Sequence, residues 1–149
     1  EIQALVTNTS YNTPQRNVTG FNYKRLGMLI AVLEKRIGLV MGTKDIFINL
    51  VGGLTIDDPA ADLSVISAIA SSTMDKYIEK NIILCGEVGL TGEVRSINNL
   101  DRRIAEALSL GFKKAIVPSS SLKTKKLKNV NIDLIPVGNV KEAFKILFQ

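Results

Sequence analysis

Apolar residues in the first third of the chain recur with the period of a helix. Between Asn22 and Gly38 they return every three or four positions, which predicts an amphipathic helix. These positions are Tyr23, Leu26, Leu29, Ile30, Leu33 and Ile37. Asn22 is a favourable N-cap and Gly38 a favourable end, because an Asn side chain can accept a helix N–H and glycine adopts the left-handed conformation.

Short runs of β-branched and apolar residues, each bounded by turn residues, predict strands. These runs are residues 2–6, 46–51, 82–85, 115–117 and 132–136. Gly86, Gly89 and Gly92 mark a tight connection into a further extended segment at 93–96. The polar stretch 8–22, which contains Pro14 and Gly20, is expected to be a loop.

Three more helices are expected. Asp58 is a favourable N-cap and Pro59 a favourable first residue for a helix that runs to about Met74, and its nearly continuous apolar surface predicts the most buried helix. Asn99 can cap a third helix that ends before Gly111, and residues 140–148 form a closing amphipathic helix. The alternation predicts an α/β or α+β sandwich in one domain that spans residues 1–149.

Composition places the chain among soluble globular proteins. Hydrophobic residues make up 46% and charged residues 22% of the sequence, and no apolar run approaches the roughly 18 residues of a spanning helix. We expect no membrane partner and a cytoplasmic location. The chain starts without Met, which we interpret as a fragment of a longer protein. The net charge of +5 favours a polyanionic partner or serves solubility.

The missing residue types exclude several chemistries. There is no histidine, which removes Ser-His-Asp and Cys-His catalysis and His-ligated metals. Cys85 is the only cysteine, so a disulfide or a Cys-based zinc site within the chain is excluded, and its apolar neighbours predict a buried thiol. Asp57, Asp58 and Asp62 could hold a divalent cation, but helix capping is the favoured interpretation, so we expect no metal.

Glycines and lysines suggest two further motifs, of which one is weak. The spacing from Gly38 to Lys44 does not fit a phosphate-binding P-loop and favours a helix end followed by a turn. The densest basic cluster comprises Lys123, Lys125, Lys126 and Lys128. It is either a solvated loop or a surface that contacts phosphates without reading bases, since aromatic residues are scarce there. Other candidate DNA contacts are Arg16, Lys24, Arg25, Arg95, Arg102 and Arg103.

Three segments together resemble the proteolytic domain of Lon proteases. They read Gly-Leu-Thr-Ile-Asp-Asp-Pro-Ala-Ala-Asp at 53–62, Gly-Glu-Val-Gly-Leu-Thr-Gly-Glu-Val-Arg at 86–95 and Asn-Asn-Leu-Asp-Arg-Arg at 98–103. In that family the first segment ends in Asp-Gly-Pro-Ser-Ala-Gly, and its nucleophilic serine falls on Ala60. The general-base lysine of the family falls on Arg103. The resemblance therefore implies a catalytic Ser-Lys dyad of which both positions are changed.

These changes remove the dyad chemistry. A methyl group cannot attack a carbonyl, and a guanidinium with a pKa above about 12 cannot accept a proton near neutrality. Ser64 lies one helical turn beyond Ala60, a shift of roughly 6 Å along the axis, and is not expected to replace the nucleophile. Asp62 stands where the family has a glycine, and we hypothesise that it forms a structural ion pair with Arg103.

Among Lon-like domains, the chain resembles those of the RadA (Sms) family of bacterial DNA repair proteins. The segments Ala-Val-Leu-Glu-Lys-Arg at 31–36 and Gly-Phe-Lys-Lys-Ala-Ile-Val-Pro at 111–118 add to this likeness. The resemblance implies a ribosomal protein S5 domain 2-like fold. It also implies a longer parent with a zinc finger and a RecA-like ATPase, so that ATP with Mg and Zn would bind outside this chain and no cofactor within it.

The resemblance further implies a role in recombination. The family forms rings, expected to be hexamers, that drive branch migration with ATP, and the Lon-like domain is its oligomerisation scaffold and DNA-binding surface. The implied partners are further copies of the chain, single- or double-stranded DNA and a recombinase. Two alternatives remain: a Lon-type peptidase or a regulator derived from one, and a purely structural scaffold without DNA contact.

Overall fold

A computed structural model describes residues 1–123 and 131–149 of the chain. The strands are β1 Ile2–Asn8, β2 Arg16–Thr19, β3 Lys44–Leu50, β4 Ile82–Leu84, β5 Glu87–Val88, β6 Val94–Arg95, β7 Lys114–Pro118 and β8 Asp133–Val137. The α-helices are α1 Tyr23–Val32, α2 Asp62–Met74, α3 Leu100–Ser109 and α4 Val140–Leu147. Shorter helical turns are η1 Leu33–Ile37, η2 Pro59–Ala61 and η3 Ser119–Lys123. The mixed α/β class predicted from the sequence is confirmed.

The N-terminal sheet has the strand order β1-β3-β2, with β1 antiparallel and β2 parallel to the central β3. Ile46, Ile48 and Leu50 of β3 are buried in the main core, which also contains residues of α1 and α2. The predicted loop at 8–22 was wrong in part, because β2 lies within it. Val18 is the only apolar residue among the four of β2, so the segment shows no strand period.

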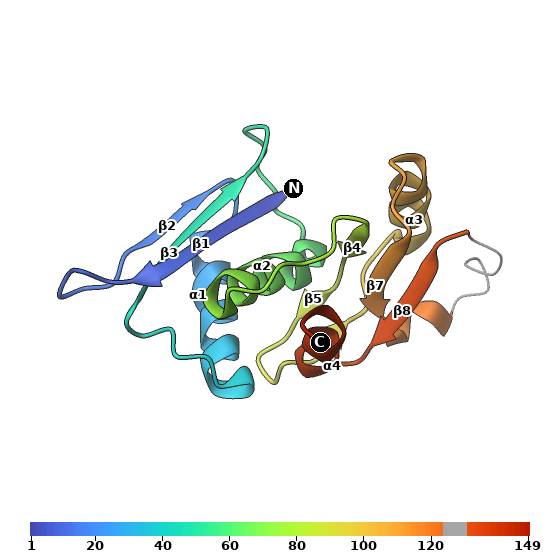
Figure 1. Cartoon of the computed structure of the whole chain (residues 1–149). Coiled ribbons are helices and arrows are strands. Elements are labelled where there is room, and N and C mark those ends of the chain that lie inside the picture. The colour runs from blue at the N-terminus through green and yellow to red at the C-terminus, as the bar shows by residue number, and fades with distance from the viewer. Residues whose placement is uncertain (124–130) are drawn as a thin grey trace.

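The second sheet is parallel throughout, in the order β4-β7-β8. Its central strand β7 is buried on both faces, which explains the continuous apolar run that predicted it. Ile116 belongs to the main core, whereas Ala115 and Val117 belong to a second cluster with Ile104 of α3. In Figure 1, α2 lies between the two sheets and α3 lies on the far side of the second sheet.

The helix ends lie at the predicted caps, and only at Asn99 does the side chain not form a capping hydrogen bond. The Asn22 side chain accepts a hydrogen bond from the Arg25 N–H at 3.0 Å, and Gly38 is left-handed with φ 86°. Asp58 caps the turn that leads into α2, the helix in which Leu63, Val65, Ile66 and Ile69 are fully buried. Asn99 occupies the N-cap position of α3, as predicted, and its carbonyl accepts a hydrogen bond from the Arg103 N–H at 3.1 Å. Asn99 is itself left-handed, with φ 56°, and makes no capping hydrogen bond with its side chain.

No helix among the described residues is both long and apolar enough to cross a bilayer. Within residues 1–123 and 131–149 there is also no group of three or more acidic or thiol side chains that could hold a metal ion.

Candidate functional site

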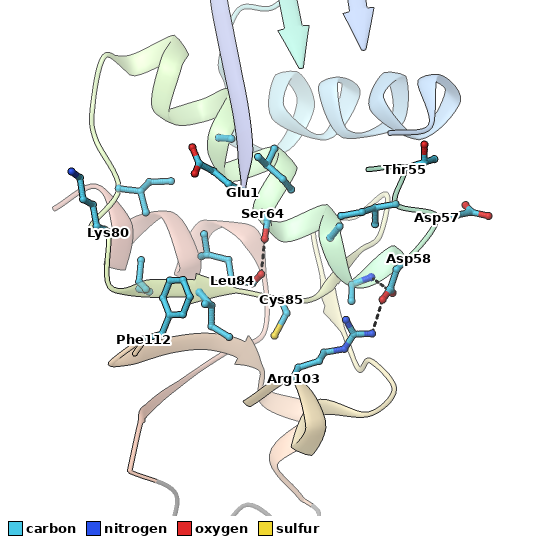
Figure 2. A pocket seen from close by; sticks show the side chains of 18 residues that line it. Glu1, Thr55, Asp57, Asp58, Ser64, Lys80, Leu84, Cys85, Arg103 and Phe112 are labelled. Atoms are coloured by element: carbon cyan, nitrogen blue, oxygen red, sulfur yellow. Dashed lines mark hydrogen bonds and ion pairs between the residues drawn. The ribbon is translucent and has the colours of Figure 1, made fainter. Parts of the chain in front are cut away.

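A cleft of about 1270 Å³ lies beside β4, the edge strand of the second sheet. Its walls are largely apolar, with Ile56, Ile82 and Phe112 among the lining side chains. Ala60, from the turn that precedes α2, and Arg103, from α3, both line this cleft. The two positions that the family motif assigns to the dyad therefore meet in one cleft, as the sequence comparison implied (Figure 2).

A single carboxylate connects these two positions. Asp58 accepts a hydrogen bond from the Ala60 N–H at 2.9 Å and another from Nη2 of Arg103 at 2.6 Å (Figure 2). Burial of the carboxyl opposes its ionisation, but these two hydrogen bonds and the Arg103 charge outweigh burial and hold the pKa of Asp58 below its ordinary value. Arg103 is fixed further by donating from Nε to the Asn98 carbonyl at 3.1 Å. An ion pair therefore links the lysine position of the family dyad, Arg103, to Asp58, two residues before the serine position.

The predicted ion pair between Asp62 and Arg103 is wrong, because each side chain has a different partner. Nε and Nη2 of Arg25 donate to the two carboxylate oxygens of Asp62, each at 2.5 Å, and the Val88 N–H donates to the same carboxylate at 3.0 Å. Asp62 is fully buried and points into the interior, whereas Arg103 is 33% exposed in the cleft. The hydrogen bond to Asp62 raises the pKa of Arg25 above its ordinary value. This ion pair ties α1 and β5 to the start of α2.

Two further side chains in the cleft, Ser64 and Cys85, are not activated as nucleophiles. The Ser64 hydroxyl donates to the Leu84 carbonyl at 2.5 Å, so its proton is directed to the backbone and not to a base (Figure 2). Burial raises the pKa of the Cys85 thiol to about 11, which keeps it protonated near neutrality, as the sequence predicted for a buried thiol. The two positions of the family dyad therefore carry neither a nucleophile nor a base, and Ser64 and Cys85 do not replace them.

Ion pairing divides the predicted DNA contacts among the described residues into two groups. Lys24 and Arg102 are exposed and form no ion pair with a described residue. Arg25 and Arg103 are paired as above, and Arg95 pairs with Glu93 at 2.5 Å and Glu87 at 3.4 Å.

The guanidinium of Arg16 is directed to the backbone. It donates to the carbonyls of Gln15, Met41 and Lys44 and thereby supports the edge strand β2. Lys125, Lys126 and Lys128, together with the side chain of Lys123, lie outside the described residues, so the predicted basic cluster stays a prediction.

Sequence reasoning missed the bridging role of Asp58 and the role of Arg25. One signal was present for both: Asp58 and Asp62 stand where the family motif Asp-Gly-Pro-Ser-Ala-Gly has its two glycines. An acid that replaces a glycine beside a helix start needs a cation or N–H donors nearby, and the structure supplies an arginine to each.

Comparison with known proteins identifies similarity to Lon proteolytic domains and to RadA proteins. The model of the Lon protease (S16) C-terminal proteolytic domain matches residues 31–149. The DNA repair protein RadA of Aquifex aeolicus is 40% identical over 99% of this chain, which spans 32% of that protein. RadA of Bacillus subtilis is 43% identical over 97% of the chain and RadA of Streptococcus pneumoniae 43% identical over 99%. The chain corresponds to 31% and 35% of those two proteins, about a third of their length.

Proposed function

The chain belongs to the family of Lon protease C-terminal proteolytic domains, and we propose that it is a non-catalytic member that serves a DNA repair protein of the RadA type. In this role it is an oligomerisation scaffold for a ring and a DNA-binding surface that does not read sequence. The chain spans about a third of its relatives, so ATP-driven branch migration and the binding of ATP, magnesium and zinc are proposed for the rest of a longer protein.

The non-catalytic assignment rests on the two hydrogen bonds by which the Asp58 carboxylate joins the Ala60 N–H to Arg103. Ala60 has no nucleophilic atom, and Arg103 keeps its proton near neutrality. In addition, the Asp58 carboxylate occupies the Ala60 N–H at 2.9 Å, one of the few backbone donors at the start of α2 that could stabilise a developing oxyanion. The two dyad positions thus lack a nucleophile and a base, and the backbone N–H at position 60 is already used.

The positive net charge and the similarity to DNA repair proteins support the DNA-binding role. The net charge of +5 favours association with phosphates, and the relatives are named as DNA repair proteins. Lys24 and Arg102 are exposed cations without an ion-pair partner among the described residues, so they can neutralise phosphates without first breaking an ion pair. Arg25, Arg95 and Arg103 would each have to give up a carboxylate.

A DNA titration across a salt series tests this role. We expect salt-sensitive binding to single- or double-stranded DNA of unrelated sequences, and a log-log salt slope that falls by about 0.9 for each phosphate contact removed. A variant with Gln at Lys123, Lys125 and Lys126 should bind more weakly and with a shallower slope. The matched control carries Gln at Lys35, Lys141 and Lys145, which are exposed and are not candidate contacts.

Both triple variants lower the net charge from +5 to +2, because each loses three cations. Equal weakening by the two variants would assign the binding to overall charge and not to the basic cluster. If the wild type forms no complex even at low salt, the DNA role fails and only the scaffold remains. Light scattering on the same samples tests the scaffold, which predicts a species of defined size larger than a monomer.

The retained cleft makes a peptidase the second candidate function. The A60S/R103K variant restores both residue types of the dyad, yet we expect no peptide hydrolysis, because Asp58 still accepts the backbone N–H at position 60 and Asp62 still replaces a glycine. Fluorogenic peptides assayed with this variant and with the wild type provide the measurement. Hydrolysis above the wild-type background would show that the two substitutions alone disabled the site.

A further inference from the structure

Strand β4 directs one row of its backbone groups away from the second sheet. The Cys85 N–H donates to the Ile116 carbonyl of the neighbouring β7 at 3.1 Å. Backbone groups of successive strand residues alternate in direction, so those of Ile82 and Leu84 point away from β7. The Ser64 hydroxyl of α2 donates to the Leu84 carbonyl from that side (Figure 2). The free edge of β4 therefore faces the cleft.

The start of α2 already pairs with one end of this edge. The Gly86 N–H donates to the Ala60 carbonyl at 2.9 Å, and the Leu63 N–H donates to the Gly86 carbonyl at 3.1 Å. Toward the start of the strand this pairing stops. Within the described part of the chain, the N–H and carbonyl of Ile82 and the N–H of Leu84 have no partner. Unpaired strand groups of this kind are a template for a further strand.

The opposite edge of the same sheet is closed to a further strand. That edge is β8, in which the Asp133 N–H donates toward β7, to the Lys113 carbonyl at 2.9 Å. Pro136 comes three residues later, so its nitrogen lies on the outer side and has no proton to donate. A proline placed in this way prevents strand addition. The three residues of β4 include neither a proline nor a charge, so β4 is the open edge.

Two depressions flank the open edge. Ile82 packs with the main core beside α2, and the cleft extends over this face of β4 as far as Ala68. Ile83 packs with the second cluster, and a depression of about 490 Å³ lies on this other face, where Ala107 and Leu110 of α3 line it. Successive side chains of a strand point to opposite faces. The side chains of an added strand would thus enter the two depressions in turn.

The charges and the backbone groups indicate the class of partner. Acids outnumber cations around the cleft, where the charged lining residues are Glu1, Asp57, Asp58, Lys80 and Arg103. A polyanion such as nucleic acid is therefore a poor occupant. An extended protein segment offers one N–H and one carbonyl at each residue except proline, as the edge requires. Because the walls beside β4 are largely apolar, apolar side chains fit them best.

We propose that the open edge of β4 binds an extended apolar segment of another protein as an added strand, and that the chain holds this segment without cleaving it. Main-chain hydrogen bonds provide the affinity, and the two depressions provide the preference for apolar side chains. Ala60 and Arg103 at the dyad positions supply no nucleophile and no base. This binding depends neither on the scaffold role nor on the DNA role.

Fluorescence anisotropy with synthetic peptides tests the proposal on the wild-type chain. The probes are fluorescein-labelled peptides Lys-Thr-Xaa-Val-Xaa-Thr-Lys, in which both Xaa positions are Val, Leu or Phe. We expect saturable binding of at least one probe. N-methylation of single backbone amides should weaken that binding about tenfold at one set of alternate residues and leave it unchanged at the other set, because alternate N–H groups of an added strand face β4.

A proline variant tests the same edge from the side of the protein. Ile82→Pro removes an N–H that points away from β7, and an edge strand tolerates proline at such a position. It should weaken probe binding at least about tenfold, since a hydrogen bond is lost and the ring blocks the edge. The matched control is Leu134→Pro, because Leu134 is also partly buried and its N–H also points outward, on β8. It should bind like the wild type, and circular dichroism should show both variants folded.

Four results would overturn the proposal. The first is that no probe binds saturably up to its solubility limit. The second is equal weakening by N-methylation at every residue or at none, which would exclude strand pairing; this comparison uses only the wild type and stands even if Ile82→Pro fails to fold. The third is a folded Ile82→Pro that binds like the wild type or like Leu134→Pro. The fourth is cleavage of a bound probe, detected by mass spectrometry, which would contradict holding without hydrolysis.

Discussion

Replacing Asp62 with Ala tests the most buried ion pair in the described structure. The substitution removes a carboxylate that is fully buried and accepts hydrogen bonds from Arg25, twice, and from the Val88 N–H. Breaking a buried pair by removing one partner costs about 3–5 kcal/mol in unfolding free energy. The stranded guanidinium of Arg25 is 28% exposed and can recover some hydration, which places the loss near the lower limit, about 3 kcal/mol.

Thermal and denaturant unfolding would measure this loss. For a chain of 149 residues, about 3 kcal/mol corresponds to a fall in Tm of roughly 6–12 °C. Urea unfolding followed by circular dichroism gives the free energy directly. A double-mutant cycle with Arg25→Ala, Asp62→Ala and both together then isolates the interaction itself, for which we expect about 1.5–3 kcal/mol.

A surface pair provides the matched control for that cycle. Lys114 and Glu79 are 2.8 Å apart, but their side chains are 41% and 61% exposed, so the same cycle on this pair should give a coupling energy indistinguishable from zero. The reasoning would be refuted if Asp62→Ala unfolded within about 0.5 kcal/mol of the wild type, or if the two cycles gave the same coupling energy.

Three further predictions concern single side chains. The Ser67 hydroxyl is buried without a hydrogen-bond partner among the described residues, so Ser67→Ala should leave the free energy of unfolding unchanged or raise it by up to about 1 kcal/mol. Ser64→Ala removes a hydrogen bond to the Leu84 carbonyl and should lower that free energy by about 1 kcal/mol. The reverse order in urea unfolding would contradict this. The hydroxyl of Thr91, helped by Arg95, lowers the pKa of Glu93 to about 2, so NMR should show Glu93 titrating near pH 2 and higher in Thr91→Val. Because the folded pKa is below the unfolded value of about 4.3, this stabilisation is present above pH 4.3 and is lost as the pH falls through about 2. Cys85 should resist alkylation in the native chain at pH 8 and react on unfolding; rapid native labelling would show an open cleft wall.

Local signals in the sequence were sufficient for most of the fold. The helical period, the Asn22 and Asp58 caps and the left-handed glycine at 38 each depend on a few neighbouring residues, and the structure has them as predicted. Strand β2 was missed because its pairing with β3 lies in long-range contacts and only Val18 marks it as apolar. Asn99 was predicted to cap because side-chain preference is visible in a sequence, whereas its left-handed backbone is not.

The sequence predicted where the candidate site lies but not which acidic residue pairs with which arginine there. The family motif places Ala60 and Arg103 together, and the structure joins them through Asp58. Which acid meets which arginine depends on the direction of each side chain from its helix. Asp62 points inward to Arg25, which lies 37 positions earlier, and no spacing in the sequence indicates that contact.

The Asp62 and Arg25 pair also separates this chain from the family motif by more than the two dyad positions. To match the family motif, Asp62 would have to be replaced by glycine, and that single substitution would leave the half-buried Arg25 and the Val88 N–H without their partner. Restoring a serine and a lysine at positions 60 and 103 would do nothing to relieve this cost, because Arg25 would need to change in the same step. The stability of this chain therefore depends on an acid at position 62, and a change toward the family motif requires positions 25 and 62 to change together.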